Sequence, residues 1–284
     1  MNEVASVTVL FHPNSEAIDS ISSYSQQVQK CFFIDNSPLP LADISRQHIA
    51  GGDFAYRHMG ANVGSAAGLN EGVRMAAAEG YRFVLTMDQD SRCSPRMVDL
   101  LLDGFHDSDR LKSSIAVACP ASSTESLLPG GSATPWSEVG FCITSGSLID
   151  TNVWKMVGGF DEQLFIDYVD HEYCLRVRAA GYRIMSRRDA ILHHHTGHLR
   201  RLDILGFRRT ISIHEPERLF YMTRNGLLLK SRYGSQFPEV GLFVRTRIVA
   251  QAVKSMIFGP ERRRRLACMM RGYRAYKVGL PARA

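Results

Sequence analysis

The chain opens with short apolar runs that alternate with helical segments, and each run ends at polar residues. Val7-Thr-Val-Leu-Phe11 stops at His12-Pro13-Asn14, residues 15–29 can form a helix, and Cys31-Phe-Phe-Ile34 then stops at Asp35-Asn36. This alternation is typical of strand–helix–strand units in a mainly parallel sheet. We therefore expect an α/β fold in which the carboxyl ends of the strands line a ligand crevice.

The pattern continues beyond these first units. We predict a third strand over 54–57, a helix from about 65 to 78 and a strand over 81–87, which would bring Asp35, the glycine loop and Asp88 together. Further along, the residue patterns predict an exposed loop over 121–135, a strand over 140–149, a helix over 168–180 and a strand over 183–192.

Composition limits the class of protein. With 284 residues, of which 45% are hydrophobic and 22% charged, the chain has enough apolar material for a core. No apolar run approaches the roughly 18 residues that span a bilayer, so we expect no transmembrane segment. The six cysteines form no CxxC pair, which disfavours a zinc site or a disulfide framework and favours reduced thiols in the cytoplasm.

Two carboxylates follow an apolar strand in Asp88-Gln89-Asp90. Oxygen ligands suit Mg²⁺ or Mn²⁺, which typically join one or two carboxylates to a substrate diphosphate. For an isolated pair of this kind, a solvated turn that begins the next helix is the more common explanation. Asp35 is open to the same two interpretations, as a ligand for a nucleotide or as part of a turn. Asn62-x-Gly64-x-x-x-Gly68 can admit a ligand close to the backbone or pack a helix closely.

The densest group of acidic residues lies between Phe160 and Arg176, where carboxylates alternate with aromatic side chains. Asp170 falls in the first turn of the predicted helix, where the helix dipole favours the ionised carboxylate. Such a group is a candidate general base, or merely a helix cap. A histidine cluster, His193-His-His-Thr-Gly-His198, offers imidazoles that could complete a metal shell.

Taken in order, these segments resemble the family-2 glycosyltransferases, which are inverting enzymes of the GT-A fold. The matching segments are VTVLFHPN, IDNS, NVGSAAGLNEG, LTMDQDS, ITSGSLI, VGGFDEQLFIDYVDHEYCLR and LHHHTG, and they extend from about Val7 to Tyr233. The sequences DQDS and FIDYVD, with Arg218-Leu-Phe-Tyr-Met-Thr-Arg224-Asn225, are similar to the bacterial rhamnosyltransferase subgroup. The resemblance implies a Rossmann-like, mixed but mainly parallel sheet in residues 1–233, followed by a basic helical region in 234–284.

The resemblance also implies roles for single residues. Asp170 would be the general base, and Asp90 and His194 would hold Mg²⁺ or Mn²⁺. Contacts to the nucleotide sugar, dTDP-rhamnose, would come from His12, Asp35, Asn62, Gly64, Gly68, Asp88, Gln89, Ser145, Gly146, Arg218 and Arg224. The acceptor would be a hydroxyl of a glycan or glycolipid. A UDP-hexose donor is the alternative within the family. Val169 replaces the glutamate of the broader family's Glu-Asp pair, and His171 is unusual at its position.

The charge is divided unevenly along the chain. Residues 1–199 carry 15 Lys and Arg against 23 Asp and Glu, whereas residues 200–284 carry 19 against 5. Most apolar residues from Leu242 to Ile257 share one face of a helix, which is typical of a membrane-surface element or of a helix packed on the catalytic domain. A non-catalytic nucleic-acid or anionic-surface binding protein is the alternative class, supported by these arginines alone. We therefore expect a cytoplasmic enzyme, peripheral on the inner face of the plasma membrane, that binds no nucleic acid.

Overall fold

The computed structural model describes residues 3–41, 52–106, 114–121, 134–194, 199–204, 207–212 and 214–279. The chain divides into two compact units. The first contains Met1–Asp161 and Asp170–His194, and the second contains Glu162–Val169 and His195–Ala284. The predicted boundary between residues 233 and 234 separates regions of different composition and stays a prediction.

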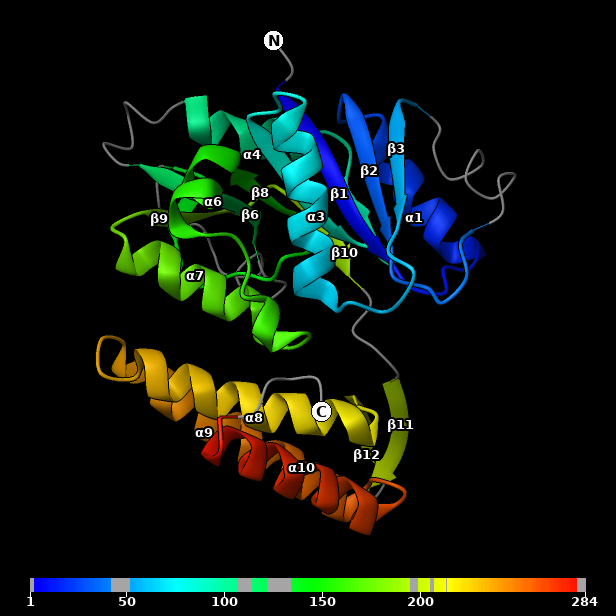
Figure 1. Cartoon of the computed structure of the whole chain (residues 1–284), viewed down its shortest axis with the longest axis vertical. Helices are drawn as coiled ribbons and strands as arrows, with labels where there is room; N and C mark the ends of the chain where they lie inside the picture. The colour runs from blue at the N-terminus through cyan, green and yellow to red at the C-terminus, as the bar shows by residue number, and fades with distance from the viewer. Residues whose placement is uncertain are drawn as a thin grey trace. The chain divides into compact units, whose positions relative to one another are not determined.

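A mixed sheet forms the centre of the first unit (Figure 1). Among the described residues its order is β3-β2-β1-β4-β8-β6-β9-β7. The strands β1 to β4 pair in parallel, β8 is antiparallel to both of its neighbours, β9 is parallel to β6 and β7 is antiparallel to β9. The strand bounds are β1 Val4–Leu10, β2 Lys30–Asp35, β3 Phe54–His58, β4 Phe83–Asp88, β6 Ile115–Pro120, β7 Trp136–Glu138, β8 Ser147–Asp150 and β9 Arg183–Arg187.

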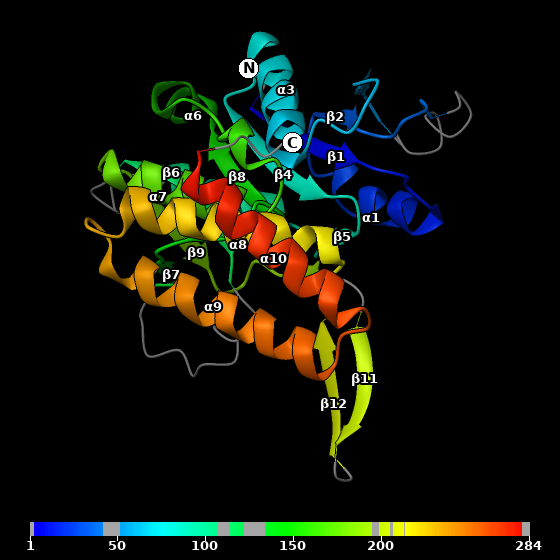
Figure 2. The same cartoon turned by 60° about the horizontal axis from the view of Figure 1, so that its bottom comes forward.

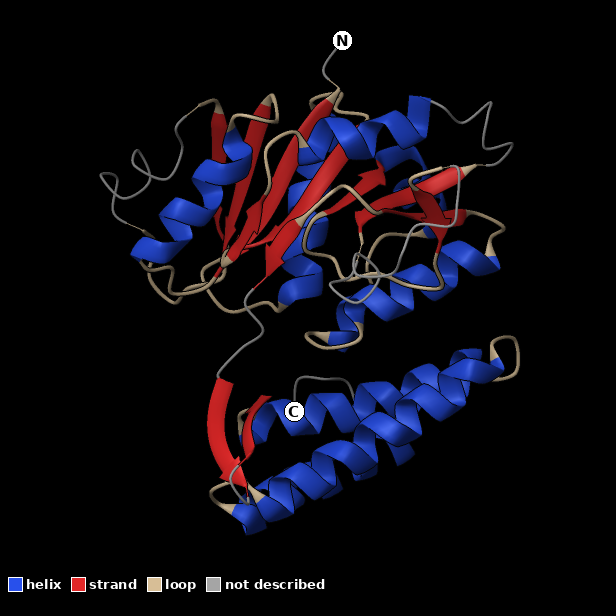
Figure 3. Cartoon of the chain, turned by 180° about the vertical axis from the view of Figure 1, so that it is seen from behind, coloured by secondary structure: helices blue, strands red, loops and turns tan. Residues whose placement is uncertain are grey.

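Helices cover both faces of this sheet (Figure 3). They are α1 Ser15–Ser25, α3 Ser65–Ala78, α4 Met97–His106, α6 Thr151–Val157 and α7 Val169–Ala179. A short antiparallel pair, β5 Ser91–Cys93 with β10 Leu192–His194, completes the unit. Local signals begin and end these helices: Asn14 accepts a hydrogen bond from the Ala17 amide at the start of α1, and Gly158 ends α6 in the left-handed region at φ 96°.

Successive side chains of β1 point to opposite faces of the sheet, so the strand packs against helices on both faces. Leu10 belongs to the core that α1 and α4 form with the sheet, together with Tyr24 and Leu101. Val7 and Val9 face the other way and meet α3 at Gly72 and Gly68. A Cβ at Gly68 would lie 3.0 Å from the side chain of Val9, so the missing side chain lets the helix approach the strand closely.

Three helices, α8 Pro216–Tyr233, α9 Pro238–Ile257 and α10 Arg262–Lys277, form most of the second unit. An antiparallel pair, β11 Leu199–Ile204 and β12 Phe207–Ser212, precedes them. The helices α8 and α10 lie side by side (Figure 2), with Leu219, Met222 and Met269 in their shared core. Gly272 permits the contact, because a Cβ there would lie 2.5 Å from the carbonyl oxygen of Phe220. Within the described residues, no helix is long and apolar enough to cross a bilayer.

Most predicted elements are confirmed, and three predicted bounds were wrong. Helix α1 ends at Ser25 because the Gln29 side chain instead accepts hydrogen bonds from the backbone amides of Glu3 and Val4. The strand predicted over 140–149 begins only at Ser147, since Gly146 turns the chain at φ 79°. The strand predicted over 183–192 is divided into β9 and β10. Of the predicted loop over 121–135, residues 122–133 lie outside the described residues.

Candidate active site

The carboxyl ends of β1, β2 and β4 meet at one edge of the sheet, as the sequence predicts. The Asn36 amide donates to the carbonyl of Leu10 at 2.8 Å, which joins the ends of β2 and β1. Gln89, just after β4, exchanges two hydrogen bonds with the backbone of Phe11 at 2.9 and 3.1 Å. His12 is exposed at this edge, and its amide donates to the Ser37 hydroxyl at 2.9 Å. This edge is the candidate donor site.

Asp35 is completely buried behind this edge. One carboxylate oxygen accepts from the Ser37 amide at 2.8 Å, and the other accepts from the Tyr56 hydroxyl at 2.5 Å. The side chain therefore shapes the loop after β2 from within. Direct contact between Asp35 and a nucleotide stays a prediction.

The glycine loop is attached to the end of β2 through Asn36. The Asn36 side chain donates to the Gly64 carbonyl at 3.0 Å, and the Gly64 amide donates to the Asn62 side chain at 3.0 Å. Gly64 has φ 89°, a conformation that side chains with a Cβ rarely adopt. The buried side-chain oxygen of Asn36 has no hydrogen-bond partner in the part of the chain that the structure describes. Gly68 has the packing role described above, and a ligand contact there stays a prediction.

Asp88 and Asp90 are both exposed at the end of β4. The loop before β8 lies beside them, because the Asp88 amide donates to the Ser145 hydroxyl at 3.1 Å and the Gly146 amide donates to the Thr86 carbonyl at 2.8 Å. The structure thus brings the predicted residues from two distant segments to one strand end. Both side chains are accessible to a ligand that approaches from solvent.

The two predicted metal ligands are Asp90, in the turn before β5, and His194, at the end of β10. In the β5–β10 ladder His194 pairs with Ser91, the residue directly after Asp90. The side chain of His194 lies outside the described residues. Among the described side chains, no cluster of three or more His, Cys, Asp or Glu has the geometry to hold a metal by itself. This donor set fits Mg²⁺ or Mn²⁺, since these ions take one or two protein carboxylates and complete their shell with phosphate and water.

Asp170 lies in the first turn of α7 with its carboxylate fixed by the next residue. Its Oδ1 accepts from the His171 backbone amide at 2.8 Å and is 2.7 Å from His171 Nδ1. The His171 ring is nearly buried and packs against Phe141 at a centroid distance of 4.7 Å. The Asp170 side chain keeps 21% of its surface exposed, so it can meet a substrate while one oxygen is held.

A small pocket beside Asp170 contains a pair of cysteines. Cys142 and Cys174 have their sulfur atoms 3.9 Å apart, and the Ser147 hydroxyl donates to Cys142 Sγ at 3.3 Å. Hydrogen bonds from Cys119, Cys174 and Ser147 hold the pKa of the Cys142 thiol well below its ordinary value. All six cysteines of the chain are free thiols.

The segment that leads into Asp170 has an uncommon backbone. Phe165, Asp167 and Tyr168 have φ values of 64°, 63° and 64°. Each residue with a Cβ in this region costs about 1–3 kcal/mol unless surrounding contacts impose it. Sequence reasoning missed this feature, because none of these residues is a glycine.

Helix α8 supplies the contacts that hold this segment. The Asn225 side chain, which is fully buried, donates to the carbonyls of Leu164, Ile166 and Asp167 at 2.8, 2.8 and 3.1 Å. Arg218 forms a two-pronged ion pair with the Asp167 carboxylate. Arg224 is buried and donates to the Gln163 carbonyl at 3.0 Å. We call Arg218, Arg224 and Asn225 the α8 clamp.

The α8 clamp gives two predicted donor-binding residues a role within the protein. Arg218 and Arg224 were predicted as phosphate partners, whereas here both bind the segment before Asp170. Their contact with a nucleotide sugar stays a prediction. The sequence analysis noted the motif that contains Arg218, Arg224 and Asn225, but it did not predict their contacts with the segment before Asp170.

Comparison with known proteins agrees with this fold. Residues 15–125 match the model of glycosyl transferase family 2. The chain is 28% identical over 248 residues to the dTDP-rhamnosyl transferase RfbF of Shigella flexneri, which covers 80% of each chain. It is also 30% identical over 146 residues to an uncharacterized protein of Mycobacterium bovis, covering 48% of this chain and 55% of that protein.

Solved structures share the fold at low sequence identity. TarS of S. aureus superposes with a TM-score of 0.52 and 12% identity over 98% of this chain, and GalNAc-T7 with a TM-score of 0.55 and 10% identity over 68%. The chain spans 44% of the length of each of these two structures. The mainly parallel sheet, the family match over residues 15–125 and the related transferase together lead to one conclusion: the chain is a glycosyltransferase of the GT-A fold that contains a segment similar to glycosyl transferase family 2.

Proposed function

We propose that this glycosyltransferase moves L-rhamnose from dTDP-rhamnose to a hydroxyl of a cell-surface glycan or lipid-linked acceptor, with inversion at the anomeric carbon. The related dTDP-rhamnosyl transferase, aligned over 80% of both chains, supports the donor. The observation that carries the mechanism is the geometry of Asp170, whose Oδ1 lies 2.7 Å from His171 Nδ1 while part of the carboxylate faces solvent.

Asp170 acts as the general base. Its carboxylate takes the proton from the acceptor hydroxyl as that oxygen attacks the anomeric carbon, while the bond from that carbon to the diphosphate oxygen breaks. One in-line displacement of this kind inverts the configuration and releases dTDP. His171 is a positioning residue: it holds one carboxylate oxygen, so that the other is presented in a fixed direction.

Asp90 and His194 would hold the divalent cation. When bound, Mg²⁺ or Mn²⁺ neutralises the charge that develops on the leaving diphosphate. The exposed Asp90 carboxylate and the pairing of His194 with Ser91 support this assignment. The other proposed contacts to the nucleotide sugar in the first unit are His12, Asp35, Asn62, Gly64, Gly68, Asp88, Gln89, Ser145 and Gly146. Arg218 and Arg224 of the second unit are proposed as phosphate partners.

The proposal also places the enzyme in the cytoplasm, with the basic C-terminal region on the inner face of the plasma membrane. Six free thiols support a reducing compartment. The excess of Lys and Arg after residue 200 supports an anionic surface as the partner of that region.

Thermal unfolding with dTDP, UDP and GDP, each with and without Mg²⁺ or Mn²⁺, tests the donor without an acceptor. A nucleotide at about 100 times its dissociation constant stabilises the native state by about 2.7 kcal/mol. We expect selective stabilisation by dTDP that needs the cation and disappears in Asp90→Asn. Selective stabilisation by UDP would replace the rhamnosyl donor with a UDP-hexose, and no response to any nucleotide would overturn the proposed donor site.

A further inference from the structure

Five large aliphatic side chains of α9 are exposed. Leu242 is 67% exposed, Val249 60%, Val253 49%, Met256 45% and Ile257 55%. At about 100° of rotation per residue these five lie within about 100° of one another around the helix axis. We call these five residues the α9 stripe.

The opposite side of α9 is the one that holds the helix in place. Val240, Val244, Gln251 and Ser255 are buried, and two of these four are polar. Ile248 and Ala252 also pack against the core that α8 and α10 share, so α9 has an apolar face inward and further large aliphatic side chains outward. An ordinary surface helix places polar side chains on its outward face. Exposed large aliphatic side chains gathered on one side of a helix mark a surface that meets something apolar.

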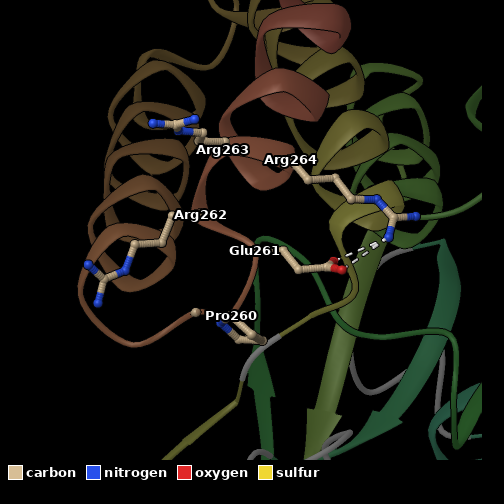
Figure 4. Close-up of a pocket in the computed structure, with 6 residues that line it drawn as sticks. Pro260, Glu261, Arg262, Arg263 and Arg264 are labelled. Atoms are coloured by element: carbon tan, nitrogen blue, oxygen red, sulfur yellow. Dashed lines mark hydrogen bonds and ion pairs between the residues drawn. The ribbon is translucent and has the colours of Figure 1, made fainter.

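Positive charge surrounds this stripe. Residues 234–284 carry 11 Lys and Arg against 2 Asp and Glu. The guanidinium of Arg262 donates to the carbonyl of Ile257 at 3.3 Å, so the basic start of α10 adjoins the end of the α9 stripe. In the pocket at this corner, Arg262 and Arg263 point away from the Glu261–Arg264 ion pair (Figure 4).

Helix α10 repeats the combination of exposed apolar and basic side chains. Leu266, Met270 and Tyr273 are 36%, 53% and 45% exposed. The exposed side chains of Arg263, Arg274 and Lys277 are interleaved with them. Both helices thus present apolar groups within a cationic surrounding, which is the pattern of helices that lie in the headgroup region of a bilayer.

We propose that the α9 stripe inserts into an anionic lipid bilayer, with Arg262 and Arg263 binding the lipid phosphates. The charge selects this partner over a second copy of the chain, because two such cationic faces repel each other. The five aliphatic side chains select it over a nucleic acid, which offers a phosphate surface but no apolar medium to bury them in. The proposal deepens the membrane attachment included in the proposed function and is independent of the donor.

Vesicle binding by the full chain tests this surface. The probes are vesicles of phosphatidylcholine alone and vesicles in which about one third of the lipid is phosphatidylglycerol. Co-sedimentation should show at least about tenfold tighter binding to the anionic vesicles, weakening as salt is added. Val249→Asp with Val253→Asp should reduce that binding at least about tenfold, because two charges would have to enter the acyl boundary.

Two further variants test the role of the arginines and the specificity of the α9 stripe. Arg262→Gln with Arg263→Gln should lower binding to anionic vesicles about tenfold or more and leave the weak binding to neutral vesicles unchanged. Met156→Asp places a charge at an equally exposed apolar residue of α6, 65% exposed, and should bind vesicles like the wild type.

Three results would overturn the proposal. One is equal or absent binding to both kinds of vesicle, and another is loss of binding in Met156→Asp to the same extent as in the stripe variant. The third is a wild-type dimer that the Val249→Asp, Val253→Asp variant converts to a monomer in sedimentation velocity, because the stripe would then bind a second copy. Stabilisation by nucleotides, measured on the same variants, reports the donor site separately and should be unchanged.

Discussion

Arg218 holds Asp167 three residues before the proposed general base. Its Nε and Nη2 atoms each lie 3.0 Å from a different oxygen of the Asp167 carboxylate, which is 6% exposed. Asp167 has φ 63°, so the ion pair fixes a residue whose backbone is unfavourable on its own. Asp170 follows three residues later in the chain, so the ion pair holds the segment that leads to it.

Replacing Arg218 with methionine should loosen this segment. The aliphatic part of the side chain remains, whereas the two hydrogen bonds to Asp167 are lost. We expect amide hydrogen exchange to become about tenfold faster or more over residues 163–169, since local opening no longer has to break the ion pair. Lys230→Met on the exposed side of α8 is the matched control. Unchanged exchange over 163–169 would show that the clamp does not hold the segment.

Variants of Asp170 and His171 should lose turnover while they keep the binding of the nucleotide sugar. Asp170→Asn removes the base but keeps the shape, so turnover should fall about 10²–10⁴-fold while the dissociation constant for the nucleotide sugar stays the same. His171→Ala removes the imidazole contact to the carboxylate but keeps the backbone hydrogen bond, and it should lower kcat more than it changes KM. Equal turnover in Asp170→Asn and the wild type would assign the base to another residue.

Gly72 should tolerate no side chain. A Cβ there would overlap Val7 Cγ1, so Gly72→Ala should lower the free energy of unfolding by about 1–3 kcal/mol in urea denaturation. Val7→Ala removes the overlap. The double variant should therefore lose less free energy of unfolding than the sum of the losses in the two single variants. Gly241→Ala in α9, where the nearest atom is 4.0 Å away, should stabilise by about 0.5–1 kcal/mol. Additive effects of Gly72→Ala and Val7→Ala would contradict the contact.

Two buried thiols predict how stability depends on pH. Burial raises the pKa of Cys31 to about 11 and that of Cys93 to about 12. The unfolded thiols ionise near pH 8.5. Above this pH the unfolded chain therefore binds fewer protons than the native one, and stability falls as the pH rises. Between pH 8 and 10 the free energy of unfolding should drop by about 2–4 kcal/mol, as measured in urea. A constant value over this range would contradict the burial of these thiols.

The sequence was informative where short-range patterns decide the structure. Alternating apolar runs predicted β1, β2 and β4, and the polar residues after them predicted that Asp35, the glycine loop and Asp88 would meet. The placement of Asp170 in the first turn of a helix followed from the same reasoning. These features depend on a few adjacent residues and on the rule that parallel strands end at one edge.

Other features depend on contacts between distant residues. Asn225 binds carbonyls about 60 positions earlier in the chain, and no local pattern indicates that a buried amide will meet three backbone oxygens. The left-handed residues before Asp170 were unpredictable for the same reason, because the contacts of α8 impose them. The apolar residues of α9 were visible in the sequence, whereas the packing of the three helices decides which of them are exposed.

Direct titration of the nucleotide sugar tests the central claim most closely. With Mg²⁺ or Mn²⁺ present, we expect the wild-type protein to bind dTDP-rhamnose at least about tenfold more tightly than UDP-glucose, a difference of about 1.4 kcal/mol. Asp90→Asn should lose this binding, and Asp170→Asn should keep it. Equal or tighter binding of UDP-glucose, or full binding by Asp90→Asn without the cation, would contradict the account.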